Sequence, residues 1–159
     1  MCGVKSSPVY EKWTGVEKNR MKMEQLSVFL ENKSGSLVEV TSALNEEGVK
    51  LIATIVTDTT EFGVLRMIVD DPEKGRKILR DQGFSCRISD VVALLVDDKD
   101  GFVSVLQNLS GSGLNIEYLY TFLQSPSGKT WMAFRCNDTE KAVDIIRNLP
   151  GVQAAEPPA

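Results

Sequence analysis

Hydrophobic positions along residues 25–89 predict the order strand, helix, strand, strand, helix, strand. Apolar and polar residues alternate between Gln25 and Asn32, which is typical of a strand with one buried face. Apolar residues then recur at helical spacing, and Gly48 is placed to end the helix. The residues on that helical face are Leu37, Val40, Thr41 and Leu44.

The second half of this segment predicts a hairpin, a helix and a closing strand. Two runs rich in β-branched residues, 49–57 and 64–69, flank a short polar turn and should pair as a hairpin. Asp71, followed by a proline, is a favourable N-cap for a helix that ends at Gly83. Residues 85–89 then form the closing strand.

The whole pattern recurs once, at an offset of 65 to 67 residues. Asn32-Lys33-Ser34-Gly35 is matched by Asp98-Lys99-Asp100-Gly101, and the helix start at Asp71 is matched at Asp138. Two units with the order βαββαβ predict an α+β protein with two ferredoxin-like domains. Each domain should be an antiparallel four-stranded sheet with both helices on one face.

The repeat also sets the expected domain boundaries. We place the first domain at residues 24–90 and the second at residues 91–156, with Asp90 and its neighbours as the linker. Residues 1–22 show no periodicity and contain serine, proline and glycine, so we expect a disordered N-terminal extension. The alternative is an arm that docks Tyr10 and Trp13 on a partner.

Composition narrows the chemistry. The chain has 159 residues, of which 42% are hydrophobic and 25% charged, as in a globular protein. It contains no histidine, so catalysis by an imidazole base and the commonest metal sites are excluded. The three cysteines, Cys2, Cys86 and Cys136, are too far apart in sequence for a metal-binding motif. We therefore expect no catalytic residue, no metal, no cofactor and no enzymatic activity.

Charge and hydropathy limit the kinds of partner that the protein is expected to bind. The net charge is −4, and because residues 1–23 carry an excess of lysine and arginine, the remaining chain is more acidic still. An acidic body repels phosphate backbones, so nucleic-acid binding is not expected. No stretch is long and apolar enough to span a membrane, and none resembles a secretion signal. We expect a cytoplasmic protein that does not bind membranes.

Two units that each open with strand, Asn/Asp-x-x-Gly and helix resemble tandem ACT domains, the small-molecule-binding modules that regulate amino-acid metabolism. The residues that carry the resemblance are Asn32-Lys33-Ser34-Gly35-Ser36-Leu37 with Gly48-Val49-Lys50-Leu51, and Asp98-Lys99-Asp100-Gly101-Phe102 with Gly113-Leu114-Asn115-Ile116. The resemblance implies a non-catalytic regulatory protein that binds an amino acid, commonly between paired domains, and acts on a partner enzyme.

An amino acid needs a receptor for its carboxylate, an acceptor for its ammonium group and a pocket for its side chain. Bare amides at a helix start bind carboxylates, and a glycine lets the ligand approach the backbone. The side chain of Asn32 or Asp98 can accept from the ammonium group, and the strand after the helix would line the pocket. The predicted ligand-binding residues are Asn32, Lys33, Ser34, Gly35, Ser36, Leu37, Leu51, Ile52 and Ala53, with Asp98, Lys99, Asp100, Gly101, Phe102, Ile116, Glu117 and Tyr118.

Simpler interpretations stay open. Asn32, Asp98 and the two loop glycines are also ordinary turn residues. Apolar residues of both parities in the hairpin around Leu119 predict that part of the second sheet face or an edge is covered by the sister unit or another subunit. We expect a homodimer or higher homo-oligomer, and the alternative function is an oligomerisation module that binds no small ligand.

Overall fold

The computed structural model describes residues 21–58, 61–97, 100–124 and 128–154. Contacts between Cα atoms divide the chain into two compact units. The first unit is Glu24–Asp90, and the second runs from Val91 and also contains Met21–Met23. None of the helices in these described ranges is long and apolar enough to cross a membrane.

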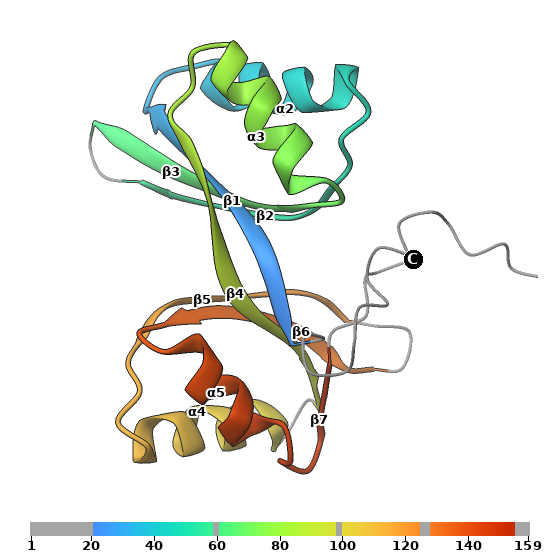
Figure 1. The fold of residues 1–159 in the computed structure, drawn as a ribbon, viewed down its shortest axis with the longest axis vertical. Coiled ribbons are helices and arrows are strands. Elements are labelled where there is room, and N and C mark those ends of the chain that lie inside the picture. The colour runs from blue at the N-terminus through green and yellow to red at the C-terminus, as the bar shows by residue number, and fades with distance from the viewer. Residues whose placement is uncertain (1–20, 59–60, 98–99, 125–127, 155–159) are drawn as a thin grey trace, which may run out of the picture. The chain divides into compact units, whose positions relative to one another are not determined.

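The first unit has the predicted element order. Its elements are β1 (Lys22–Glu31), α2 (Ser36–Glu46), β2 (Leu51–Asp58), β3 (Phe62–Val69), α3 (Pro72–Asp81) and the first part of β4 (Cys86–Val96). The strands lie in the order β2-β3-β1-β4, and β3 is antiparallel to both β1 and β2. Figure 1 shows α2 and α3 on the same face of this sheet. Leu26, Val28 and Leu30 of β1 pack there in the core under the helices.

The second unit repeats this architecture. It continues from β4 through α4 (Gly101–Gly111), β5 (Ile116–Gln124), β6 (Thr130–Cys136), α5 (Thr139–Ile146) and β7 (Val152–Ala154). The strand order is β5-β6-β4-β7, and the pairs β5–β6, β6–β4 and β4–β7 are antiparallel. Both α4 and α5 lie on one face of this sheet (Figure 1). The predicted α+β class with two ferredoxin-like units is confirmed.

The helix starts of the two units use the same polar contact. Asp71 and Asp138 precede α3 and α5, and each carboxylate accepts a hydrogen bond from a backbone amide three residues later. The distances are 3.2 Å to the amide of Lys74 and 3.0 Å to that of Lys141. The N-caps expected from the sequence are therefore present in both copies.

The start of the fold and the form of the linker differ from the sequence prediction, while the division between the two units falls after Asp90. The strand β1 begins at Lys22, and Met21 is buried with its carbonyl oxygen accepting from the amide of Ala93 at 2.9 Å, so these two residues belong to the fold and not to an N-terminal extension. The expected linker at Asp90 lies inside the continuous strand β4. Residues 1–20, which contain the rest of the expected extension, lie outside the described residues.

Candidate functional site

The first loop, residues 32–35, leaves its glycine open. Gly35 has a φ of 93°, a left-handed conformation that favours glycine, and it is the N-cap of α2. A Cβ atom built at Gly35 meets no heavy atom within 4 Å. Asn32, Lys33 and Ser34 are exposed beside it.

The amides at the start of α2 remain available. No side chain caps this helix, and the first-turn bonds are from the Ser36 amide to the Lys33 carbonyl at 3.4 Å and from the Glu39 amide to the Gly35 carbonyl at 2.9 Å. No acceptor for the amides of Leu37 and Val38 lies among the described residues. Two bare donors at the positive end of a helix dipole form a receptor for a carboxylate.

Charged side chains beside the loop form one ion pair. Lys33 Nζ lies 2.9 Å from Glu31 Oε2, and both side chains are exposed. The hydrogen bond and the charge of Lys33 lower the pKa of Glu31, and Glu31 in turn raises the pKa of Lys33. Because this pair is exposed it is weak, so both Lys33 and the backbone amides of α2 are candidates for holding an anion here.

The second loop is less open than the first at its glycine, Gly101. This glycine is buried, and a Cβ atom built on it would lie 3.2 Å from the carbonyl oxygen of Gly151 and 3.2 Å from Val96 Cβ. Phe102 packs against the core of the second unit, and Asp100 is exposed. Asp98 and Lys99 lie outside the described residues. The α4 backbone at Gly101 is therefore less accessible to a ligand.

The contact of the closing strand extends further in the second unit. There the amide of Asp97 donates to the carbonyl of Gly151 at 3.0 Å, which places Gly151 against Gly101. In the first unit Phe29 donates to Ser85 at 2.9 Å, which matches the pairing of Leu95 with Gln153 in the second unit. Within the described ranges, the amide of Glu31, the counterpart of Asp97, makes no such bond to residues 83–85.

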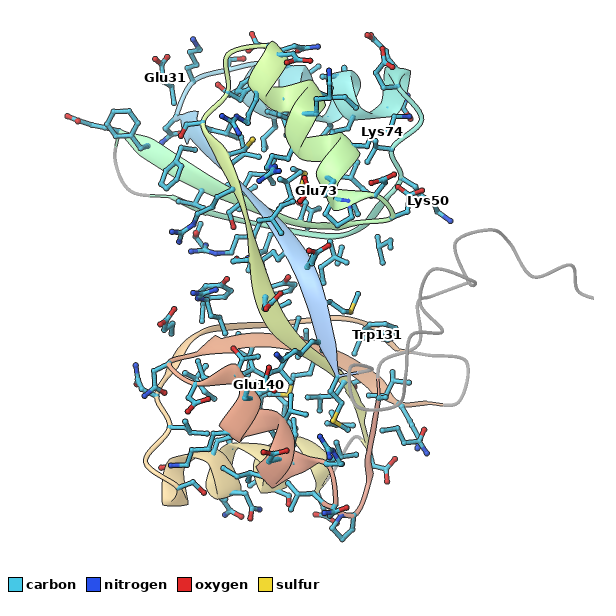
Figure 2. All side chains as sticks on the ribbon, viewed as in Figure 1. Glu31, Lys50, Glu73, Lys74, Trp131 and Glu140 are labelled. Carbon is cyan, nitrogen blue, oxygen red and sulfur yellow. The ribbon has the colours of Figure 1, made fainter. Side chains whose placement is uncertain are left out.

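The predicted loop and the predicted pocket strand lie at opposite ends of each unit. Leu51 pairs with Val69 at one end of β3, whereas Glu31, beside the loop, pairs with Phe62 at the other. Seven positions along β3 separate these two pairs, which is about 24 Å of strand. Glu31 and Lys50 mark the two ends in Figure 2. One unit by itself therefore does not bring the loop and the start of the pocket strand together.

The start of each pocket strand is irregular in the same way. A β-bulge lies between Leu51 and Ala53 in β2, and another lies between Ile116 and Tyr118 in β5. The predicted site residues Ile52 and Glu117 are therefore the bulged positions, and Glu117 pairs with Arg135 at 3.0 Å. The other segments show mixed exposure: Leu51, Ile116 and Tyr118 are half-buried and Ala53 is buried. Bulges redirect side chains and are common next to binding sites.

Sequence reasoning missed the apolar surface around the first loop. Four exposed apolar side chains lie at this end of the first unit: Phe29, Leu37, Val38 and Phe62. Their exposed fractions run from 45% to 65%. Phe29, Val38 and Phe62 are out of phase with the buried face of their strand or helix, and that phase was the signal available in the sequence. Leu37, which the sequence placed on one helical face with Val40 and Leu44, is exposed instead. Exposed apolar side chains gathered at one end of a unit are typical of surfaces that another molecule covers.

The described residues contain no group of three or more cysteine, aspartate or glutamate side chains that could hold a metal ion. The two described cysteines are free, and burial raises the pKa of both the Cys86 and the Cys136 thiol. A raised thiol pKa disfavours the nucleophilic thiolate. These side chains are therefore poor candidates for covalent chemistry.

Comparison with known proteins gives one family. A family model described as an ACT domain pair matches residues 21–153. Protein BT0572 from Bacteroides thetaiotaomicron has a similar solved structure, with a TM-score of 0.76, 36% sequence identity and coverage of 85% of this chain and 94% of that chain. No curated protein sequence matches this chain significantly.

More distant solved structures share the fold. The regulatory subunit of aspartate kinase from Thermus thermophilus, in its ligand-free form, has a TM-score of 0.55 and 14% identity, over 78% of this chain and 90% of that chain. The corresponding subunit from Thermus flavus has a TM-score of 0.53 and 13% identity, with the same coverage. At this identity the likeness shows the architecture and not the ligand.

Proposed function

Since the chain belongs to the ACT domain-pair family, we propose that it is a non-catalytic regulatory protein that binds a free amino acid at the first loop. The observation that carries the proposal is the open glycine turn at Gly35, next to the bare amides of Leu37 and Val38. Gly101 of the second loop lies against Gly151 and Val96, so the first loop is the better-supported receptor for a carboxylate.

The groups at this loop match an amino acid. The ligand carboxylate accepts from the amides of Leu37 and Val38, and the ligand ammonium donates to the side-chain oxygen of Asn32, which is exposed. Lys33, whose pair with Glu31 is exposed, is a second candidate for holding the carboxylate. We propose an amino acid with an apolar side chain, because the apolar side chains of Phe62 and Leu37 flank the loop.

A second unit completes the pocket. Because Leu51–Ala53 lies at the far end of its own sheet, the side chain of the ligand must meet a strand start from elsewhere. We propose that this strand is the Leu51–Ala53 segment of a second copy, and the exposed apolar side chains around the loop would be covered in such a pairing. Ligand binding then changes the pairing and, through it, a partner enzyme of amino-acid metabolism. A relative by fold that serves as a regulatory subunit of aspartate kinase supports this regulatory role.

Isothermal titration calorimetry of the full chain against each of the twenty amino acids tests the proposal, at protein concentrations that favour pairing. We expect one amino acid to bind and to raise the melting temperature. Asn32→Ala should abolish this shift, whereas Asn45→Ala, an exposed asparagine at the other end of α2, should leave it unchanged. Absence of binding across all twenty amino acids would overturn the proposal.

The exposed apolar side chains favour a second candidate, a self-association module without a small ligand. This version requires the same pairing surface but no open amides. Sedimentation velocity of the unaltered chain and of Phe62→Ser distinguishes the two candidate functions. If the variant loses self-association and no amino acid changes the self-association of the unaltered chain, the self-association module alone is supported.

A further inference from the structure

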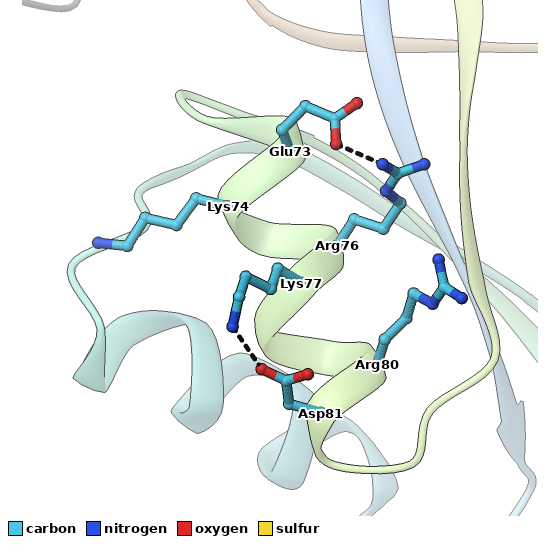
Figure 3. A pocket seen from close by; sticks show the side chains of 6 residues that line it. All are labelled: Glu73, Lys74, Arg76, Lys77, Arg80 and Asp81. Carbon is cyan, nitrogen blue, oxygen red and sulfur yellow. Dashed lines mark hydrogen bonds and ion pairs between the residues drawn. The ribbon is translucent and has the colours of Figure 1, made fainter.

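Helix α3 of the first unit carries a basic surface that the second unit lacks. Its exposed side chains are Glu73, Lys74, Arg76, Lys77, Arg80 and Asp81, which line an open hollow of about 800 Å³ (Figure 3). Four of these six are cations, although the chain as a whole has a net charge of −4. At the offset of 67 residues, α5 places Val143 and Asp144 where α3 has Arg76 and Lys77.

Position 76 is exposed, whereas its counterpart in the second unit, position 143, is buried in the core. Val143 is only 2% exposed and lies in the core of the second unit. Arg76 occupies the matching position in α3, and its side chain is 39% exposed. A buried valine stabilises a fold more than a half-exposed arginine at the same place. A charged residue at a helix position where an apolar residue would stabilise the fold is expected at a functional surface.

The cations differ in what already holds them. Lys74 donates to the carbonyl of Glu47, as Lys141 does to that of Ser112 in the second unit, so this lysine serves the fold. Lys77 pairs with Asp81 at 2.8 Å and Arg76 with Glu73 at 2.6 Å, and all four side chains are exposed. Arg80 has no ion-pair partner in the part of the chain that the structure describes.

Arg76 and Arg80 form the centre of the surface. They extend to the same side of α3 in Figure 3. Arg80 follows Arg76 by four positions, which is about 6 Å along the helix axis. Carboxylates on two successive turns of another helix have the same spacing, and arginine binds a carboxylate with two parallel hydrogen bonds.

We propose that the Arg76–Arg80 face of α3 docks an acidic helix of a partner protein, with carboxylates spaced four residues apart. A protein fits better than a nucleic acid, because Glu73 and Asp81 flank the arginines and the chain is acidic as a whole. It also fits better than the α5 helix of a second copy, because that helix carries the cations Lys141 and Arg147 beside its carboxylates Glu140 and Asp144. The proposal is independent of ligand binding at the first loop.

Fluorescence anisotropy with the full chain tests this surface. The probe is a labelled synthetic helix of about 15 residues, a length at which isolated helices begin to form, with glutamates at every fourth position. We expect saturable binding that weakens with added salt, and about tenfold weaker binding for Arg80→Ala, corresponding to about 1.4 kcal/mol. A helix with lysines in place of the glutamates should not bind.

Two variants keep the result interpretable. Arg76→Val introduces the valine that the second unit has at the matching position, so the variant should fold. Its melting temperature checks the folding. We expect it to weaken binding of the labelled helix as Arg80→Ala does. Arg147→Ala, at the position that matches Arg80, should leave binding unchanged. Four results would overturn the proposal. Two concern the acidic helix: it does not bind, or Arg80→Ala and Arg147→Ala weaken its binding equally. The others are tighter binding of a short single-stranded RNA and a change in self-association on Arg80→Ala.

Discussion

Lys141 Nζ donates a hydrogen bond to the carbonyl oxygen of Ser112 at 3.0 Å, and so ties the start of α5 to the end of α4. Ser112 is the C-cap of α4, where carbonyl groups lack partners within the helix. Lys74 makes the same contact with Glu47, the C-cap of α2. The duplicated lysine thus joins the two helices of each unit.

Replacing Lys141 with methionine should lower the free energy of unfolding by about 0.5–1.5 kcal/mol, because the Ser112 carbonyl loses a charged donor at a helix C-terminus. Urea denaturation measures the change. Lys50→Met is the matched control, since Lys50 is exposed and its side chain contacts no carbonyl within the described ranges. Equal losses in the two variants would show that the contact does not contribute.

Asp138→Ala should cost about 1 kcal/mol of stability, because its carboxylate caps α5 through the amide of Lys141 at 3.0 Å. Asp138→Ser should recover most of this loss, as serine also caps helices. Chemical denaturation of the three proteins gives the order. Asp144→Ala provides the control, since its exposed pair with Arg147 at 3.4 Å should contribute little. A loss in Asp144→Ala as large as in Asp138→Ala would contradict the assignment.

Local signals in the sequence were enough to predict the fold. The N-caps Asp71 and Asp138 and the alternation that buries Leu26 and Val28 follow from neighbouring residues, and the structure confirms them. The repeat then implied the second unit. Met21 was misassigned because its partner Ala93 is distant in sequence, and no local pattern shows such a hydrogen bond.

The candidate site was predicted only in part, for two physical reasons. Gly35 and Gly101 look equivalent in sequence, but Gly151, which is distant in sequence, lies against Gly101, and no residue in the part of the chain that the structure describes lies against Gly35 in the same way. The separation of Leu51 from the first loop follows from the topology, because β1 and β2 both pair antiparallel to β3 and so start at the same end of the sheet. The βαββαβ order already implied this separation.

Gly101→Ala should destabilise the protein by about 1 kcal/mol, because the added methyl group would press against the Gly151 carbonyl and Val96, each at 3.2 Å. Gly111→Ala, at the other end of α4, meets no atom within 4 Å and should instead stabilise the helix by about 0.5–1 kcal/mol. Thermal and urea unfolding of the two variants should therefore change in opposite directions. Stabilisation by Gly101→Ala would show that the second loop has room for a ligand.

Alkaline pH should weaken the fold through its two described thiols. Burial raises the pKa of Cys86 and of Cys136, so the folded protein keeps these protons at pH values where an unfolded thiol, with a pKa of about 8.5, begins to lose them. Their contribution to stability is present below that pKa and is lost as the pH rises toward the higher folded values. We expect the free energy of unfolding to fall between about pH 8 and pH 9.5, where lysines stay largely protonated.

The double variant Cys86→Ala/Cys136→Ala isolates this contribution. It should lose less stability than the unaltered chain over the same pH interval, whatever its stability at pH 8, because the buried groups that titrate have been removed. Urea denaturation at both pH values, under reducing conditions, gives the two differences. If the variant and the unaltered chain decline in parallel, the thiols keep ordinary pKa values in the folded state, and burial at Cys136 does not protect its proton.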